Sequence, residues 1–179
     1  MTQVVSTYAQ ALYSLAKDEG LGRQILEEMA VLAQAFKEEP DFVRLLSVPN
    51  LSKETRCGIV DESFRNRVHP YLLNFLKILT EKGYARHFAD CAAAYRAAYN
   101  ADHGILSVSA VSAVALSDVQ KDKLTEKLSR ITGKTIELQC RIDPAVLGGI
   151  RLDYDGKRVD GTVKNRMDAI RDLLKNTVL

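Results

Sequence analysis

The side chains of this chain that could do chemistry are few. His87 and Cys91 stand four positions apart in a helical pattern, so both could face one metal ion. A stable zinc site needs three or four protein ligands, and the sequence holds neither a His-Glu-x-x-His motif nor a second Cys-His pair. We therefore interpret the two residues as packed helix positions and expect no metal site.

Two glycine-containing segments resemble ligand-binding loops but depart from them. The run Asp153-Tyr154-Asp155-Gly156 begins like a calcium loop, yet its glycine is misplaced and the position of the bidentate glutamate falls on Lys164. We interpret this run as a turn. Gly148-Gly149 lack the lysine that follows in a phosphate loop, so close backbone packing explains them better.

Catalytic nucleophiles are also missing from the sequence. It has no Gly-x-Ser-x-Gly motif, and its three histidines lie in helical or linker segments without a nucleophile nearby in sequence. Neither a Gly-x-Gly-x-x-Gly motif nor a Walker loop occurs. We expect a protein without catalytic residues, cofactor or small-molecule substrate, and keep metal- or nucleotide-dependent catalysis as a minor alternative.

The composition indicates a globular chain whose net charge is too small to create a strong electrostatic field. Lys and Arg number 25 against 23 Asp and Glu, so a net charge of +2 does not point to nucleic acid or anionic lipid. With 46% hydrophobic and 27% charged residues, 179 residues fit one domain or two small ones. The longest uncharged apolar stretch, 104–117, is shorter than the roughly 20 residues of a membrane helix. The amino-terminal residues lack a targeting pattern, and the three cysteines read as reduced thiols, so we start from a cytosolic protein.

The hydrophobic pattern changes near Gly104, which predicts an N-terminal domain over 1–104 and a C-terminal domain over 105–179. Apolar residues recur at helical spacing in the first part, with Pro40 and Pro70 at positions suited to a first helical turn. Short connections favour an antiparallel six-helix bundle. The helices are expected at 4–19, 21–38, 40–46, 52–65, 70–82 and 84–102.

The second part predicts a small α+β domain, so the fold class is mostly α with an α+β C-terminal part. Ser117 and Gln120 have the spacing of a capping box before a helix that stops at Gly133. Alternating residues around 106–110 and 136–141 indicate strands. Asp155-Gly156 predicts a hairpin turn joining 149–154 to 157–160, and a last helix is expected at 162–176.

Two of the predicted helices carry more apolar surface than one buried face needs. The apolar arc spans about 200° on helix 4–19 and about 220° on helix 70–82, against about 140° on helix 21–38. Either these two helices are central in the bundle, or they form an exposed groove for an amphipathic helix of another protein. The arcs comprise Val4, Val5, Tyr8, Ala9, Ala11, Leu12, Tyr13, Leu15 and Ala16, and Tyr71, Leu72, Leu73, Phe75, Leu76, Ile78 and Leu79.

The run Asp143-Pro144-Ala145-Val146-Leu147-Gly148-Gly149-Ile150-Arg151 is the most specific motif of the C-terminal part. It resembles the signature of the delta subunit of F-type ATP synthases, the homologue of the mitochondrial oligomycin-sensitivity-conferring protein. The opening helix, with Tyr8-Ala9-Gln10-Ala11-Leu12-Tyr13, is also similar to that family, and the resemblance covers the whole chain. The signature runs from Asp143 to Arg151 and continues through 155–156 and 159–163 to Arg166. Its structural positions are Asp143, Pro144, Gly148, Gly149, Asp160, Gly161 and Arg166.

The resemblance implies a non-catalytic stator subunit of the ATP synthase. Its N-terminal domain would hold the N-terminal helix of an alpha subunit between the first and fifth helices, and its C-terminal domain would join the C-terminal ends of the b subunits. Ion flow is then coupled to ATP synthesis because the catalytic head cannot turn with the shaft. The protein would lie on the cytoplasmic face of the bacterial cell membrane, attached through the complex.

Particular residues are expected to carry these roles. The groove candidates, some of which must face the core, are Val5, Tyr8, Ala9, Leu12, Tyr13, Leu72, Phe75, Leu76 and Leu79. We expect Gly148, Gly149 and Gly161 to serve backbone geometry, and we hypothesise that Arg166 reaches Asp160 or nearby carbonyls. The alternative function is a free-standing adaptor whose helical groove accepts an unrelated amphipathic helix.

Overall fold

The computed structural model describes residues 3–48, 51–163, 165 and 167. The described chain is mostly helical, with seven α-helices and one four-stranded sheet toward its C-terminal end. It divides into two compact units, Met1–Tyr99 and Asn100–Leu179. This division falls inside the last helix of the first unit, whereas the pattern change at Gly104 coincides with the end of that helix.

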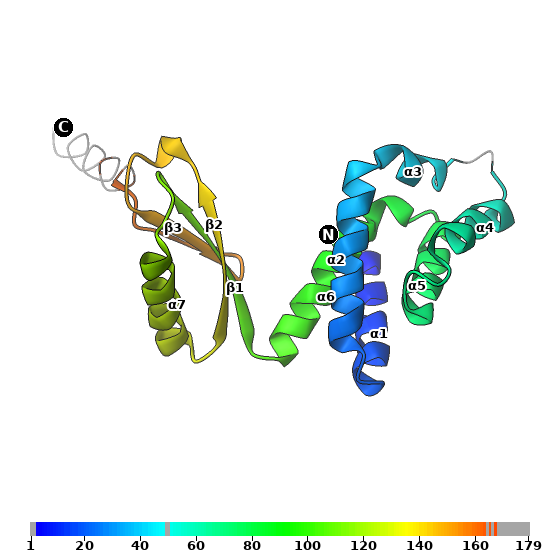
Figure 1. Ribbon diagram of the computed structural model, residues 1–179, viewed down its shortest axis with the longest axis horizontal. Helices are drawn as coiled ribbons and strands as arrows, with labels where there is room; N and C mark the ends of the chain where they lie inside the picture. Colours follow the sequence, from blue (N-terminus) through cyan, green and yellow to red (C-terminus); the bar gives the residue numbers. More distant parts are fainter. Residues whose placement is uncertain (1–2, 49–50, 164, 166, 168–179) are drawn as a thin grey trace, which may run out of the picture. The chain divides into compact units, whose positions relative to one another are not determined.

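The first unit contains six α-helices among its described residues (Figure 1). The first five have bounds within one residue of those predicted, whereas the sixth begins with a 3-10 turn, η1, over Ala85–His87. The α-helices are α1 Gln3–Asp18, α2 Gly22–Glu38, α3 Pro40–Leu45, α4 Lys53–Phe64, α5 Pro70–Glu81 and α6 Phe88–Asp102.

Local hydrogen bonds explain where several helices begin. The Ser52 hydroxyl accepts from the Thr55 backbone N–H at 3.1 Å and caps α4. At the start of α5, His69 Nδ1 accepts from the Tyr71 N–H at 3.2 Å, and Pro70 occupies the first turn, where no amide donor is missed. The His69 N–H donates to Glu28 at 2.7 Å, which ties α5 to α2.

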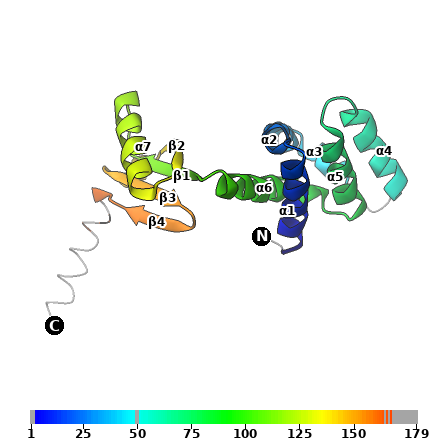
Figure 2. The same ribbon diagram turned by 90° about the horizontal axis from the view of Figure 1, so that it is seen from below.

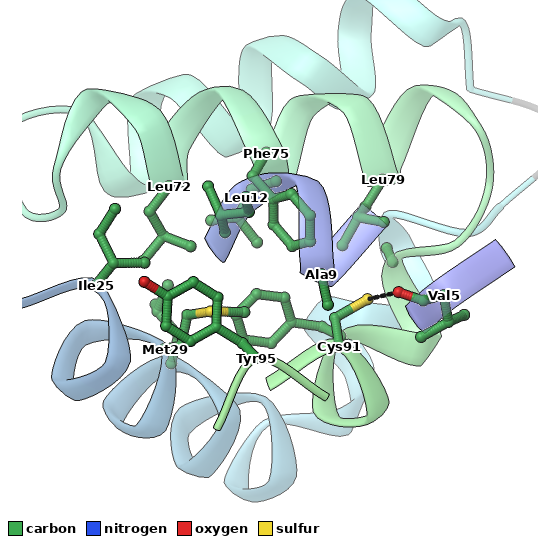
Figure 3. Close-up of a cluster of buried hydrophobic side chains, with 14 of the residues drawn as sticks. Val5, Ala9, Leu12, Ile25, Met29, Leu72, Phe75, Leu79, Cys91 and Tyr95 are labelled. Carbon is green, nitrogen blue, oxygen red and sulfur yellow. Dashed lines mark hydrogen bonds between the residues drawn. The ribbon is translucent and has the colours of Figure 1, made fainter. Parts of the chain in front are cut away.

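The core of the first unit is a continuous apolar cluster built from five of its helices, α1, α2, α4, α5 and α6, and the end of α3 (Figure 3). Tyr95, Phe88, Ile25 and Met29 are the largest fully buried side chains. The Tyr95 hydroxyl donates to the Gly22 carbonyl at 3.1 Å, so its polar end is satisfied in the core. Burial raises the pKa of this hydroxyl well above its ordinary value.

The second unit is a mixed sheet with one crossover helix. Its elements are β1 Ile105–Ser112, α7 Asp118–Thr132, β2 Thr135–Ile142, the 3-10 turn η2 Pro144–Val146, β3 Ile150–Tyr154 and β4 Lys157–Asp160. The strand order is β2-β1-β3-β4. β1 pairs with β2 in parallel and with β3 antiparallel, and β3 pairs with β4 antiparallel. The parallel pair requires the crossover that α7 provides.

Two predictions for this unit are confirmed in detail. The Ser117 hydroxyl accepts from the Gln120 N–H at 3.3 Å, and the Gln120 side chain accepts from the Ser117 N–H at 2.9 Å, which is the predicted capping box of α7. Asp155 and Gly156 form the β3–β4 turn with φ of 49° and 71°. Positive φ at both positions is typical of a tight hairpin turn.

The last predicted helix, 162–176, lies mostly outside the described residues. Its beginning is described: the Thr162 hydroxyl accepts from the Asn165 N–H at 3.2 Å, as an N-cap residue does. Thr162 itself is buried.

Candidate functional site

The groove residues expected on α1 and α5 lie mainly in the core. Of the nine, only Tyr8 is half-buried, and the other eight are buried by the first unit itself (Figure 3). The eight are at most 8% exposed, so they leave little surface for an open trough in this unit, and their contact with a partner stays a prediction. The eight buried residues are Val5, Ala9, Leu12, Tyr13, Leu72, Phe75, Leu76 and Leu79.

Tyr13 shows how these candidates contribute to the core. The sequence argument placed this tyrosine in the groove, where its hydroxyl could reach water. In the structure its ring meets Tyr95 edge-on, with centroids 5.4 Å apart, and Tyr99 at 6.3 Å. These contacts bury the ring between α1 and α6. The tyrosine is therefore part of an aromatic cluster that joins two helices of the core.

A separate apolar row remains exposed on α1. Val4 and Leu15 are 40% and 43% exposed, Ala11 is exposed, and Tyr8 is half-buried. These residues recur at intervals of four, three and four, so they form one row along the helix. The row belongs to the predicted apolar arc, on the side away from the core residues Val5, Leu12 and Ala16. The wide arc thus consists of a buried part and an exposed part.

α5 shows the same division on a smaller scale. Ile78 is 42% exposed and Tyr71 is half-buried, although the apolar side chains between them in sequence are mostly buried. α1 and α5 lie side by side (Figure 2). Lys77, on the polar edge of α5, forms an ion pair with Asp61 of α4.

We define the α1/α5 surface as Val4, Tyr8, Ala11, Leu15, Tyr71 and Ile78. Sequence reasoning included all six in its apolar arcs but selected only Tyr8 as a partner contact. In the sequence, these residues differ from the core residues only in lying at one edge of each apolar arc. Which edge faces solvent depends on where the neighbouring helices pack, and the arc does not give that.

The signature residues of the second unit build a compact turn between β2 and β3. Asp143 Oδ1 accepts from the Ala145 N–H at 3.0 Å, and Pro144 occupies the first position of η2. The Gly161 N–H donates to the Ile150 carbonyl at 3.1 Å, and the Val163 N–H donates to the Gly148 carbonyl at 3.0 Å. These two bonds join the start of β3 and Gly148 before it to the segment after β4.

Gly149 is the position where no other residue fits. Its φ is +81°, and a Cβ placed on it would lie 2.6 Å from the Gly161 carbonyl oxygen and 3.0 Å from the Thr162 Cα. Both contacts are with backbone, which cannot rotate away. The close approach explains Gly149 through backbone geometry, whereas a Cβ on Gly148 would meet only the Val163 side chain, at 3.4 Å.

Asp160 binds its own chain in this turn. Its carboxylate accepts from the Thr162 N–H at 2.9 Å. Hydrogen bonds from Thr162 hold the pKa of Asp160 below its ordinary value. The hypothesised partner Arg166 lies outside the described residues, so its role stays a prediction.

The residues first considered for metal chemistry have ordinary partners. His87 Nδ1 lies 3.2 Å from an Asp90 carboxylate oxygen. Cys91 is buried, and its thiol donates to the Val5 carbonyl at 4.0 Å (Figure 3). Burial, and secondarily the charge of Asp90, raise the pKa of Cys91 to about 11, so this thiol is a poor metal ligand at neutral pH. No cluster of three metal-ligating side chains occurs in the described part of the chain.

Comparison with known families identifies the chain's relatives. The family model described as ATP synthase delta (OSCP) subunit matches residues 4–174, which is almost the entire sequence. The chain belongs to this family. The delta-family chain is accordingly a non-catalytic subunit of an ATP synthase, as its lack of catalytic motifs predicted.

Individual relatives agree with this membership over at least 94% of their length. The chain is 31% identical over 180 residues to an ATP synthase subunit delta of Alkaliphilus oremlandii, covering 100% of both proteins. It is 32% identical over 173 residues to that of Lactobacillus gasseri, covering 96% of this chain and 94% of the relative. The subunit delta of Clostridioides difficile is 28% identical over 176 residues, with 98% and 97% covered.

A solved structure has the same fold. One chain in the cryo-EM structure of the Toxoplasma gondii mitochondrial ATP synthase hexamer superimposes with a TM-score of 0.78, at 19% identity, and covers 97% of this chain and 98% of that one. The delta-family fold is therefore similar despite low identity. Among the residues that are described, no helix combines the length and the apolar character needed to cross a membrane.

Proposed function

We propose that this delta-family chain holds the catalytic head of the ATP synthase against the peripheral stalk. In this role the first unit binds the N-terminal helix of an alpha subunit, and the second unit binds the C-terminal ends of the b subunits. The six helices of the first unit act as one bundle and the whole chain sits on the cytoplasmic face of the bacterial cell membrane. Ion flow can then be coupled to ATP synthesis, because the head resists the torque of the rotating shaft.

The observation that carries this proposal is the exposed apolar row on α1 beside α5. Val4, Leu15 and Ile78 each leave about two fifths of their surface in water, although the core is already complete. Such a surplus is what an amphipathic helix covers when it lies on two neighbouring helices. Tyr8 and Tyr71, half-buried and packed against the core, suit the edge of that contact because a tyrosine ring buries area while its hydroxyl can still bond to water.

The surface differs in kind from the groove predicted from sequence. A partner helix would lie on the solvent-exposed side of α1 and α5. The buried candidates pack on the opposite side of these helices, in the core of the first unit. Leu12 and Leu72 would then act as scaffold, since both are buried in the core of the first unit. Binding energy would come mainly from apolar area, at about 25 cal/mol per Å² before the costs of ordering and association.

Affinity purification from solubilised membranes of the source organism tests the proposed role. We expect a tagged full-length chain to recover the alpha, beta and b subunits. Leu15→Asp should lose the alpha and beta subunits but keep b. Val31→Asp is the matched control, because Val31 is a β-branched apolar residue that is 70% exposed on α2 and lies outside the α1/α5 surface.

Each other result contradicts a defined part of the proposal. Recovery of only soluble partners by the wild-type chain would favour the free-standing adaptor. Retention of alpha and beta by Leu15→Asp would exclude the α1/α5 surface as the head contact. Loss of alpha and beta by Val31→Asp as well would show that the surface has been drawn too narrowly.

A further inference from the structure

β2 is an end strand of the sheet, and its edge is open to the addition of another strand. It is eight residues long, and its register with β1 is unbroken from Thr135 to Ile142. Its sequence contains neither the proline nor the glycine that often interrupts an edge. The other end strand, β4, is four residues long and begins with Lys157 and Arg158, as protected edges do.

Alternate residues of β2 present their backbone N–H and C=O groups to this open edge. The Thr135 N–H donates to the Gly104 carbonyl at 3.0 Å, and the Asp143 N–H donates to the Ser112 carbonyl at 2.9 Å. The odd-numbered positions therefore face β1, and in a regular strand the positions between them face the opposite way. The outward-facing positions are Ile136, Leu138, Cys140 and Ile142.

The cover over the apolar face of the sheet stops short of this edge. Val108 and Ala110 of β1 are 1% and 0% exposed. Their register partners on β2, Leu138 and Cys140, are half-buried and exposed. Ile142, at the end of the strand, is 60% exposed. The elements that bury β1 thus leave room beside β2 for a further strand and its own cover.

Two charged side chains on the other face of β2 lack an opposite charge. Arg141 has no ion pair or side-chain hydrogen bond with any residue that the structure describes. Glu137 accepts from the Ser107 hydroxyl at 2.6 Å through one carboxylate oxygen, and a carboxylate can accept further bonds. Because four residues of extended strand place Glu137 and Arg141 about 13 Å apart, they cannot pair with each other.

A second copy of the chain supplies both missing partners in a single register. When two β2 strands run antiparallel with Gln139 opposite Gln139, each Glu137 lies opposite Arg141 of the other copy. Each Ile136 then lies opposite Ile142. The outward-facing positions meet one another, as hydrogen-bonded pairs require, and the charges fall on non-hydrogen-bonded pairs, where side chains lie closest.

The neighbouring registers do not offer this match. Centring the pair on Cys140 would place Glu137 opposite Asp143, which brings like charges together. Centring it on Leu138 would place Glu137 opposite Gln139 and leave both charges without an ion pair. The register centred on Gln139 is also the one in which the two strands overlap most fully.

We infer that β2 pairs antiparallel with β2 of a second copy, centred on Gln139, so that the isolated chain forms a two-fold symmetric dimer through its second unit. The contact is self-complementary, as a two-fold interface must be. This inference goes beyond the proposed function, because it concerns two copies of the chain apart from the ATP synthase. One strand pair buries less than the roughly 1,200–2,000 Å² of a stable interface, so the dimer is weak and depends on concentration.

Sedimentation velocity of the full-length chain at increasing concentration tests this inference. The wild-type mass should rise from 19.9 kDa toward twice that value. Arg141→Glu should weaken association by about tenfold or more, because it places like charges opposite each other at both pairs. Combining it with Glu137→Arg should restore association to near the wild-type level. The control is Lys127→Glu, a charge reversal at an exposed position of α7, which should leave association within about twofold of wild type.

A disulfide tests the register directly. All variants carry Cys140→Ser, which removes an exposed thiol. Gln139→Cys should then give a disulfide-linked dimer in air, because the Cα atoms of a non-hydrogen-bonded pair lie about 4.5 Å apart, within the span of a disulfide. Glu137→Cys is the matched control and should not link, because its two copies are offset by about 13 Å along the strands.

The other outcomes overturn the inference. A wild-type chain that stays at 19.9 kDa at every concentration has no such contact. A dimer that the double charge reversal does not restore, or that links through Glu137→Cys as readily as through Gln139→Cys, is built on another surface or register. None of these results bears on the head and stalk contacts of the proposed function, which the affinity purification tests separately.

Discussion

Leu12 and Leu15 of α1 offer a direct test of the division between scaffold and contact. They are the same residue type, three positions apart on one helix, and are 5% and 43% exposed. Leu12→Ala should lower the free energy of unfolding by about 2–5 kcal/mol, because it opens a cavity in the core. Leu15→Ala should lower it by less, about 0.5–1 kcal/mol, because this side chain is only partly buried in the fold and its removal opens no closed cavity.

The effect of Leu15→Ala on binding follows from its exposed fraction. Full burial of a leucine is worth about 1.5–3 kcal/mol, and a partner helix can bury only the remaining 43% of the residue, of which alanine retains part. We therefore expect a loss of about 0.5–1 kcal/mol, which corresponds to about two- to fivefold in the dissociation constant. The number is small because the exposed row shares the contact among several residues.

The assay pairs two measurements on the full-length chain. Urea unfolding followed by circular dichroism reports stability, and isothermal titration with a peptide from the alpha N-terminus reports binding. The expected result is a crossed pattern, with Leu12→Ala affecting stability and Leu15→Ala affecting affinity. The reasoning is refuted if Leu15→Ala costs as much stability as Leu12→Ala, or if it leaves the affinity of a binding peptide unchanged.

Three further predictions concern the signature turn and the thiols. Gly149→Ala should destabilise the second unit by about 3 kcal/mol or more, because its Cβ would meet backbone atoms. Gly156→Ala is the control and should cost about 1 kcal/mol, because Gly156 has a similar φ of +71° but open space where its Cβ would lie. Equal losses in urea unfolding would contradict the close approach at Gly149. Because the pKa of Asp160 is lowered in the fold, its stabilising contribution is present above the ordinary Asp range and is lost as pH falls through the lowered pKa. Asp160→Asn should therefore reduce the dependence of stability on pH in acid, and an unchanged profile would show that the bond to Thr162 is not stabilising. At neutral pH an alkylating reagent should modify the exposed Cys140 quickly and the buried Cys91 only after unfolding, as mass spectrometry of the digested protein can show; rapid modification of Cys91 in the native state would contradict its burial.

Sequence reasoning succeeded where local chemistry decides the structure. Ser117 and Gln120 define the start of α7 through bonds within four residues, and Asp155-Gly156 defines a hairpin because the turn needs positive φ at both positions. The parallel pairing of β1 with β2 was not predicted. Alternation shows which side chains share a face of a strand, but it does not specify the neighbouring strand or its direction.

The candidate site was predicted to the level of the helix but not of the residue. An apolar arc of about 200° correctly marked α1 as a helix with surplus apolar surface. Where the core takes its share of that arc depends on α5 and α6, whose packing is set by contacts distant in sequence. The burial of Tyr13 could not be predicted from the arc, because it depends on contacts with Tyr95 and Tyr99.

The central place of β1 in its sheet has a mechanical consequence. A single backbone leads from α6 through Gly104 into β1, and β1 is hydrogen-bonded on both sides, to β2 and to β3. Tension applied at Ile105 along the strand loads these bonds together in shear, whereas an edge strand can be peeled off one bond at a time. In a protein that transmits force between a motor and its anchor, the connection thus enters the second unit at the strand best able to bear a pull.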